Sequence, residues 1–476
     1  GMTRSLVHSD IFPSPFPLSP VTQASSHSTS SSSTCESSLK VFRGTPMMDY
    51  CLIPRAKRGL KGDTVQAKHE HGISPDERTD ILSSGESSGA VKLSKEILAS
   101  ENENQLRSEN ETGELIFTGT GSAIPCKHRN VTGMYLSMNN GNAMLLDVGE
   151  GTLGQLLRAK RYHLKPTDNV SDYFQTLIRN IKAVWISHPH ADHHLGLLRF
   201  LTERNAICGV GVDPIVLMAP PSLFRFLTEY EVVDPRVRNS YLAVDCRDME
   251  YEKTNPMGDK LHTDLGLTWC AAVPVSHCAH SYAVVMDGTS FGRLTYSGDC
   301  RPSHLLADVG RNSDLLIHEA TFLDEMKEEA ALKRHSTVGE ALDVGLRMMS
   351  KAVVLTHFSQ RYPKIPPLSS STIVNEEKAG IQSEENGENT SGKCPSTSVG
   401  FPVVFAFDFM RLKPSTISTA SKLSPALRLL YPGDDKKSEV ENEDDVVLSL
   451  ETNDEPVATA KEILSVPGMF ATKGIL

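Results

Sequence analysis

Residues 188–194 read His-Pro-His-Ala-Asp-His-His, which gathers four candidate metal ligands into six positions and adds a further histidine. The apolar run 183–187 comes directly before and is typical of a strand, whereas the run 195–201 comes directly after and is typical of the start of a helix. The candidate ligands therefore lie on a predicted strand-to-helix turn, where a folded sheet can hold reactive groups in place.

The spacing of these ligands indicates two adjacent metal ions. Alternate residues of an extended segment point the same way, so His188 and His190 can share one ion while Asp192 and His193 face a second. A His-rich surface loop is the simpler alternative. The spacing, together with further acids and histidines downstream, favours a metal site.

Three more candidates follow apolar strand-like runs: His277, Asp299 and His357. The full set then holds five imidazoles and two carboxylates, which fits two metal ions joined by a carboxylate and a solvent molecule. Asp299 is the natural bridge because a carboxylate has two oxygens. Nitrogen and oxygen ligands favour two Zn²⁺ ions, with Mn²⁺ or Fe as alternatives. His280 competes with His277 as a ligand, but a supporting or packing histidine is the favoured interpretation.

The middle of the chain predicts an α/β fold. Apolar strand candidates alternate with helical stretches in two halves, which indicates a four-layer sandwich with helices outside two packed sheets. The expected strands are 115–118, 143–147, 184–186, 215–218, 271–275, 282–285, 294–296, 315–317, 353–356 and 403–407.

Composition divides the chain into three parts. Residues 1–110 are Ser-rich and poor in apolar side chains, so we expect them to be mostly disordered, and residues 111–432 form the predicted catalytic domain. Within that domain, 369–400 is an expected disordered insert, and 433–476 is an expected acidic low-complexity tail. Residues 370–400 carry a charge of −3 and residues 434–457 a charge of −8, which together equal the net charge of −11. The rest is formally neutral and can still bind a polyanion through local cations and bound metal.

The nine cysteines include no Cys-x-x-Cys pair, which is typical of a reduced intracellular protein. No apolar run reaches the roughly 20 residues of a membrane span, so we expect no membrane partner. The compartment stays open between nucleus, mitochondrion and plastid.

Taken in order, the motifs resemble the catalytic carboxy-terminal half of long-form ribonuclease Z, a tRNA 3′-processing endonuclease of the metallo-β-lactamase superfamily. The segments that carry the resemblance are Phe117-Thr-Gly-Thr-Gly-Ser-Ala-Ile-Pro125, Arg129-Asn130, Asp147-Val-Gly-Glu-Gly-Thr152, 188–193, His277, Tyr296-Ser-Gly-Asp299, His318-Glu-Ala-Thr321, His335-Ser-Thr337 and His357-Phe-Ser-Gln-Arg-Tyr362. Each motif occurs in other hydrolases, but the ordered set is specific. The resemblance implies a metallo-β-lactamase four-layer αββα sandwich.

The resemblance also implies a role for each site residue. The first zinc would be held by His188, His190 and His277, the second by Asp192, His193 and His357, and Asp299 would bridge them. Asp192 would also orient or deprotonate the attacking water. His335 would donate a proton to the leaving oxygen, and Glu319 would hydrogen-bond to it. Asp147 and Glu150 are expected to support the metal loop by hydrogen bonds rather than bind metal.

The implied substrate is precursor tRNA, from which the enzyme would remove the 3′ trailer, leaving a 3′-hydroxyl on the tRNA and a 5′-phosphate on the trailer. The expected substrate-binding residues are Arg129, Arg361 and Lys364, with Lys127 and Arg301 as further basic groups near the site. Each of these charges could equally be a solvated surface group.

One departure concerns the amino-terminal half of the long forms, which bears a tRNA-binding arm and has no counterpart here beyond a remnant at 49–60. A homodimer is one expected substitute for that half. The alternatives to the tRNA-processing function are another metallo-β-lactamase-type phosphodiesterase, a small-molecule hydrolase such as a thioesterase, and an inactive tRNA-binding fragment.

Overall fold

The structure is a computed structural model of the 476-residue chain. It describes residues 50–51, 59–60, 80, 83–99, 113–161, 170–209, 211–361 and 400–430. The chain divides into two units, Gly1–Pro432 and Gly433–Leu476, and every described residue lies in the first. The predicted acidic tail lies outside the described residues, as does the predicted insert except for Gly400.

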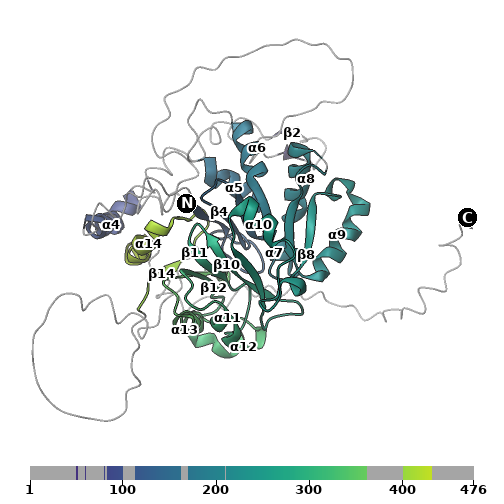
Figure 1. Ribbon diagram of the computed structural model, residues 1–476. Coiled ribbons are helices and arrows are strands. Elements are labelled where there is room, and N and C mark those ends of the chain that lie inside the picture. The colour runs from purple at the N-terminus through teal and green to yellow at the C-terminus, as the bar shows by residue number, and fades with distance from the viewer. Residues whose placement is uncertain are drawn as a thin grey trace, which may run out of the picture. The chain divides into compact units, whose positions relative to one another are not determined.

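Two β-sheets organise the described chain (Figure 1), with strand orders β15-β3-β4-β5-β6-β7-β8 and β14-β13-β12-β11-β10-β9. The first sheet comprises β3 (Glu114–Gly119), β4 (Gly133–Ser137), β5 (Ala143–Val148), β6 (Ile181–Trp185), β7 (Ile215–Ala219), β8 (Tyr241–Asp245) and β15 (Arg411–Leu412). The second comprises β9 (Trp269–Pro274), β10 (Tyr282–Thr289), β11 (Gly292–Tyr296), β12 (Leu315–Glu319), β13 (Val353–Thr356) and β14 (Val403–Phe405). A separate antiparallel pair joins β1 (Tyr50–Cys51) to β2 (Gly59–Leu60).

Both faces of the seven-stranded sheet are buried, so its strands read as continuous apolar runs. Alternate residues such as Leu146 and Trp185 point into a core shared with the six-stranded sheet. Their neighbours Leu145 and Val184 point the other way, into a second core shared with helices. Sheet therefore packs on sheet on one side, and helices cover the other.

The helices complete the outer layers. Those with residues in the second core are α5 (Thr152–Arg161), α6 (Val170–Asn180), α8 (Leu197–Cys208) and α9 (Pro221–Val233). Those with residues in the shared core are α4 (Ala90–Ala99), α10 (Gly258–Leu265), α11 (His304–Val309), α13 (Val338–Met348), α14 (Ile417–Lys422) and α15 (Ser424–Leu430). α12 (Lys327–Lys333) buries Ala330 outside that core. Short connectors are α7 (Ala191–His194), η2 (Pro235–Val237), η3 (Cys246–Met249), η4 (Asp324–Met326) and η5 (Pro414–Thr416). The predicted four-layer α/β sandwich is confirmed, and no helix in the described ranges is both long and apolar enough to cross a bilayer.

Three strands of the two large sheets were not predicted from the sequence, β4, β8 and β15, and neither was the short pair β1 and β2. β8 is an edge strand with several half-buried residues, and β15 has only two residues, so neither forms an apolar run. α4 lies within the stretch expected to be mostly disordered, yet Ala90 is fully buried in the shared core and α4 contacts α15. Four apolar residues at helical spacing were too few to predict this contact from the sequence.

The close approach of Gly196 to residues 148 and 149 can be tested by substitution. Its N–H donates to the Val148 carbonyl, and a Cβ there would overlap the carbonyl oxygen of Gly149. We expect Gly196→Ala to lower the free energy of unfolding by about 1–3 kcal/mol, because overpacking must displace backbone. The matched control is Gly154→Ala, at an exposed position of α5. This substitution should leave the free energy of unfolding unchanged or raise it by up to about 1 kcal/mol. Denaturant unfolding measures both, and equal stability of the two variants would contradict the close approach.

Candidate metal centre and active-site cleft

All seven predicted ligands meet where strands of the two sheets end. β6 ends at Trp185, shortly before His188, and α7 then carries Asp192 and His193. The six-stranded sheet supplies the other three ligands: His277 follows β9, Asp299 follows β11 and His357 follows β13. Carboxyl ends of strands in α/β folds are the usual location of ligand sites, because loops there are held by a buried sheet.

The seven predicted ligands form two groups whose donor atoms lie within 4.8 Å of one another: His188, His190, His277 and Asp299, and Asp192, His193 and His357. A third group of this kind joins Asp299 and His357 to His335. Asp299 lies between the groups. Its Oδ2 is 3.6 Å from His188 Nε2, 3.7 Å from His277 Nε2, 3.4 Å from His193 Nε2 and 3.3 Å from His357 Nε2. This is the position that a carboxylate bridging two ions requires.

Asp147 orients one ligand from each group. His193 Nδ1 donates to Asp147 Oδ2 at 2.7 Å, and Tyr296 donates its hydroxyl to the same oxygen at 2.6 Å. Ser187 Oγ also donates to this carboxylate, at 2.8 Å, so it accepts from His188 Nδ1 at 3.0 Å. Asp147 has a left-handed φ of 53°, which aspartate tolerates better than most residues. The expected supporting role of Asp147 agrees with these contacts.

Two further ligands are oriented in the same manner. His277 Nδ1 donates to the Arg334 carbonyl at 3.0 Å. Thr321 Oγ1 donates to Glu319 Oε2 at 2.6 Å, and therefore accepts from His357 Nδ1 at 2.9 Å. In all four histidines the Nδ1 proton is used outside the cluster, which leaves the Nε2 lone pair facing inward.

These residues fit a metal cofactor. Lone-pair nitrogens lie close together, with His188 Nε2 3.0 Å from His190 Nδ1 and His193 Nε2 3.3 Å from His357 Nε2. Facing lone pairs repel unless a cation lies between them. Among the described residues, the buried Asp299 Oδ1 also has no hydrogen-bond partner, and such an orphaned oxygen is costly. The all-nitrogen and oxygen donor set suits zinc.

The buried charges support metal binding. Burial lowers the pKa of His188 well below its ordinary value, which keeps the ring neutral and able to coordinate. At His193, burial opposes protonation, but Asp299, Asp192 and Asp147 outweigh it and hold the pKa well above the usual value. Metal binding at His193 would therefore release a proton.

His335 and Glu319 form a pair beside the metal ligands. His335 Nδ1 lies 2.9 Å from Glu319 Oε1, and Glu319 is 1% exposed and also accepts from the Cys300 N–H. Burial alone would lower the pKa of His335, but the Glu319 carboxylate and Asp299 raise it to about 9. The ring is thus positively charged at neutral pH, with Nε2–H available to donate. His335 Nδ1 is 3.9 Å from Asp299, but its hydrogen bond to Glu319 makes it a poor metal ligand.

A cleft of about 330 Å³ joins these groups. It is lined by Ser122, Ala123, His190, Asp192, Asp299, Thr321, Phe322, Lys333, His335, His357, Ser359, Gln360 and Arg361. Arg361 and Lys333 both pair with Glu329, at 2.9 Å each, and Lys333 lies over the Phe322 ring. Phe322 and Lys333 were not predicted to line the cleft; the available signal was their position in the sequence next to His318-Glu-Ala-Thr321 and His335-Ser-Thr337.

The three expected substrate-binding residues differ in their location. Arg361 lies at the cleft, and Lys364 lies outside the described residues. Arg129 corrects the expectation of a surface cation: it is 1% exposed, donates to the Ala406 carbonyl at 2.8 Å, and stacks on Phe358 at 4.4 Å. A guanidinium held inside by a carbonyl and aromatic rings stabilises the fold. It is not available to a phosphate.

The remaining polar residues lie apart from the donor groups of the described chain. His280 is exposed and lies outside the donor groups, so the packing role expected of it is not seen. Glu150 is also exposed, and its loop is held through its main-chain carbonyl, which accepts from Asn130 Nδ2 at 2.9 Å, rather than through the side chain as expected. Lys127 is exposed. His194 is nearly buried, with Nε2 3.2 Å from the Pro189 carbonyl, so it helps to hold the metal-binding turn.

Comparison with known proteins agrees with this geometry. The β-lactamase superfamily domain family matches residues 142–358. Residues 142–358 therefore match the domain of this superfamily. It is 35% identical over 331 residues to zinc phosphodiesterase ELAC protein 2 of Gorilla gorilla gorilla, covering 67% of this chain and 36% of the relative. It is 32% identical over 385 residues to tRNase Z TRZ3, mitochondrial, of Arabidopsis thaliana, covering 70% of this chain and 39% of the relative.

The fold also matches a crystal structure of a long form RNase Z from yeast, with a TM-score of 0.54 and 24% identity over 68% of this chain and 45% of that one. The predicted metallo-β-lactamase fold and the resemblance to long-form ribonuclease Z are confirmed. The chain spans less than half the length of each of these three relatives.

Asp147→Asn tests the supporting hydrogen bonds. The amide keeps the size and the left-handed backbone but loses an acceptor for Ser187, His193 or Tyr296. We expect metal affinity to fall about 10–100-fold, measured by competition with a chromogenic chelator. Glu150→Gln on the same loop is the matched control and should bind metal like the parent chain. Equal affinity of both variants would show that Asp147 does not orient the ligands.

Proposed function

We propose that this chain is a zinc-dependent endoribonuclease that removes the 3′ trailer from precursor tRNA, leaving a 3′-hydroxyl on the tRNA and a 5′-phosphate on the trailer. One observation carries the proposal: seven metal-ligand candidates cluster beside a charged histidine–carboxylate pair, and four of the seven (His190, Asp192, Asp299 and His357) line one cleft together with His335. The metal ligands alone are common to many hydrolases. A proton donor beside them suits a reaction with a poor leaving group.

The relatives support the substrate class. One relative is named a zinc phosphodiesterase and another a tRNase Z, and both match about two thirds of this chain or more. Two relatives, from Arabidopsis thaliana and Drosophila melanogaster, are named mitochondrial, which favours the mitochondrion among the compartments considered. Self-association of this chain stays a prediction.

In the proposed mechanism, His188, His190 and His277 would hold one zinc ion, Asp192, His193 and His357 would hold the other, and Asp299, which lies between the two groups, would serve both. When bound, the ions would activate a solvent molecule near neutral pH and stabilise charge on the phosphoryl oxygens. Asp192 is itself held in place, because its Oδ2 accepts the Ala123 N–H at 2.7 Å. Its carboxylate at the cleft can therefore orient the attacking water.

His335 completes the proposed reaction. As the bond between phosphorus and the 3′-oxygen breaks, the departing oxygen takes the proton from His335 Nε2. Glu319 stabilises the imidazolium and fixes its Nδ1 outside the cleft. Arg361, and Lys364 by its sequence position, would contact phosphates beside the scissile bond.

His335→Ala tests the proton donor. An RNA 3′-oxygen leaves poorly without a proton, whereas p-nitrophenolate leaves readily. We expect the variant to cleave precursor tRNA about 10²–10⁴-fold more slowly and bis(p-nitrophenyl) phosphate with less than about a tenfold loss. Initial rates on the two substrates give the ratio. Equal losses on both substrates would contradict the assigned role of His335.

Metal removal tests the mechanism and the rival activities. Chelation should abolish cleavage of both substrates, and added zinc should restore it, with two zinc atoms per chain by elemental analysis. Asp192→Ala should lose both cleavage and part of the bound zinc. Cleavage that survives complete chelation would rule out the metal mechanism. A zinc-loaded chain that hydrolyses a thioester but neither phosphodiester would instead be a small-molecule hydrolase.

A further inference from the structure

Arg301 lies where three loops of the site come together. It follows Asp299 by two residues, so it belongs to the loop that carries the bridging carboxylate. Its backbone N–H donates to the Ser276 carbonyl at 2.9 Å, directly before His277. The main chain at Arg301 therefore joins the loop of Asp299 to the loop of His277.

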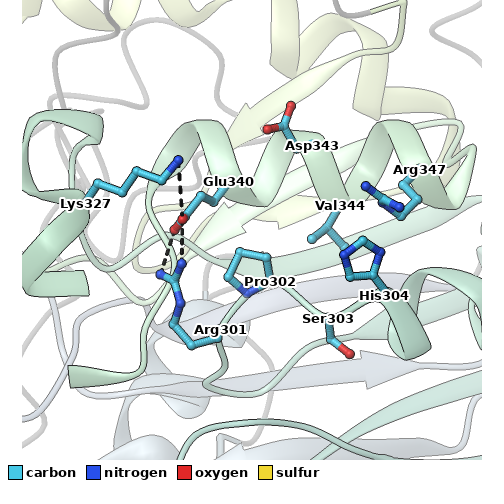
Figure 2. A pocket seen from close by; sticks show the side chains of 9 residues that line it. All are labelled: Arg301, Pro302, Ser303, His304, Lys327, Glu340, Asp343, Val344 and Arg347. Carbon is cyan, nitrogen blue, oxygen red and sulfur yellow. Dashed lines mark hydrogen bonds and ion pairs between the residues drawn. The ribbon is translucent and has the colours of Figure 1, made fainter. Parts of the chain in front are cut away.

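The guanidinium of Arg301 reaches a third loop. Nη1 donates to the carbonyl oxygen of His335, and the same side chain forms a two-point contact with Glu340, with Nη1 2.8 Å from Oε2 and Nη2 2.6 Å from Oε1. Figure 2 shows this contact, with Lys327 as a second cation 3.9 Å from Glu340. Paired charges with two parallel hydrogen bonds are stronger and more directional than single ones.

Glu340 is a firm anchor for this contact. It is 8% exposed and lies in the first turn of α13. It forms a capping box in which Thr337 Oγ1 accepts the Glu340 N–H and Glu340 Oε2 accepts the Thr337 N–H. The carboxylate that Arg301 binds is thus fixed to the start of a helix.

His335 lies in the short connector between α12 and α13. Arg334 before it adopts a left-handed φ of 58°, and the His335 N–H donates to the Ala330 carbonyl at 2.8 Å. With its carbonyl held by Arg301, both backbone groups of His335 are hydrogen-bonded. The ring is held at Nδ1 by Glu319. Arg301 therefore fixes the position of the His335 main chain, and Glu319 fixes the orientation of the His335 ring.

We propose that Arg301, with Glu340, is a positioning residue that holds His335 beside Asp299, where the ring can donate a proton to the leaving oxygen. This proposal rests on the proposed function of His335. Arg301 acts through His335 rather than on substrate. Its side chain lines a separate cavity of about 300 Å³, with Pro302, Ser303, His304, Lys327, Glu340, Asp343, Val344 and Arg347 (Figure 2). No residue lining this cavity lines the metal-centre cleft.

The chemistry of the contact requires arginine. One planar fork reaches the His335 carbonyl and both Glu340 oxygens at once. A lysine ammonium is a point charge on a flexible stem and cannot reproduce this geometry. The segment 334–337 would then keep its hydrogen bonds to Ala330 and to Cys300 of the Asp299 loop but lose the one that holds the His335 carbonyl. A displacement of about 1 Å is enough to cost a catalytic group about 10²-fold in rate.

Arg301→Lys and Glu340→Gln test the proposal in the full-length chain. We expect each variant to lower kcat on precursor tRNA about 10–100-fold, while KM, the zinc content and kcat on bis(p-nitrophenyl) phosphate change less than about threefold. The selective loss is the key readout, because a structural defect would lower both substrates and the melting temperature together. Lys327→Gln, which removes a 70%-exposed cation of the same cavity, is the matched control and should behave like the parent chain.

Combining each variant with His335→Ala shows whether the residues act through His335. We expect no further loss on precursor tRNA in the double variants, because residues that act as one unit have non-additive effects. Additive losses, or equal losses on both substrates, would overturn the proposal. The proposal would also be overturned if the single variant Arg301→Lys were fully active while the single variant His335→Ala were defective. That result would leave the proposed function of His335 intact. If His335→Ala itself cleaves RNA normally, the proposed function fails first.

Discussion

The inward-facing imidazoles around Asp299 are the feature on which the rest of this structure depends. Imidazole nitrogens lie close together within each ligand group, and the buried Asp299 Oδ1 has no hydrogen-bond partner among the described residues, so the donor set suits bound cations. Hydrogen bonds outside the cluster keep the rings from turning away. Asp147 does this for His188 and His193 together, so the ligand sets of the two proposed ions are oriented by one carboxylate.

The two-sheet architecture supplies the rigidity that such a site needs. The seven-stranded sheet provides Asp147 and the turn 188–194, and the six-stranded sheet provides His277, Asp299 and His357. A single core between the sheets fixes one set of strand ends against the other, because close-packed interiors transmit displacement rather than absorb it. The site is therefore as precise as the packing between the sheets.

Glu319 couples the proposed proton donor to the metal ligands. One of its oxygens accepts from His335, and the other accepts from Thr321, which in turn accepts from His357. The same carboxylate thus sets the charge of an acid and the tautomer of a ligand. The contact of Arg301 with Glu340 adds a backbone link to this arrangement, so His335 is held both through its ring and through its main chain.

The sequence by itself determined the seven ligand candidates and the α/β layering, which follow from local spacing and apolar periodicity. The resemblance to a family implied the division of the ligands between two ions and the pairing of His335 with Glu319. Tertiary structure decided the rest. It buried Arg129 against Phe358, brought Lys333 and Phe322 to the cleft, placed α4 against α15 and joined Arg301 to His335. Periodicity reports which face of an element is buried, but not which distant side chain completes a hydrogen bond. Residues such as Arg129 and Ala406 meet only because the last strands return to the first sheet.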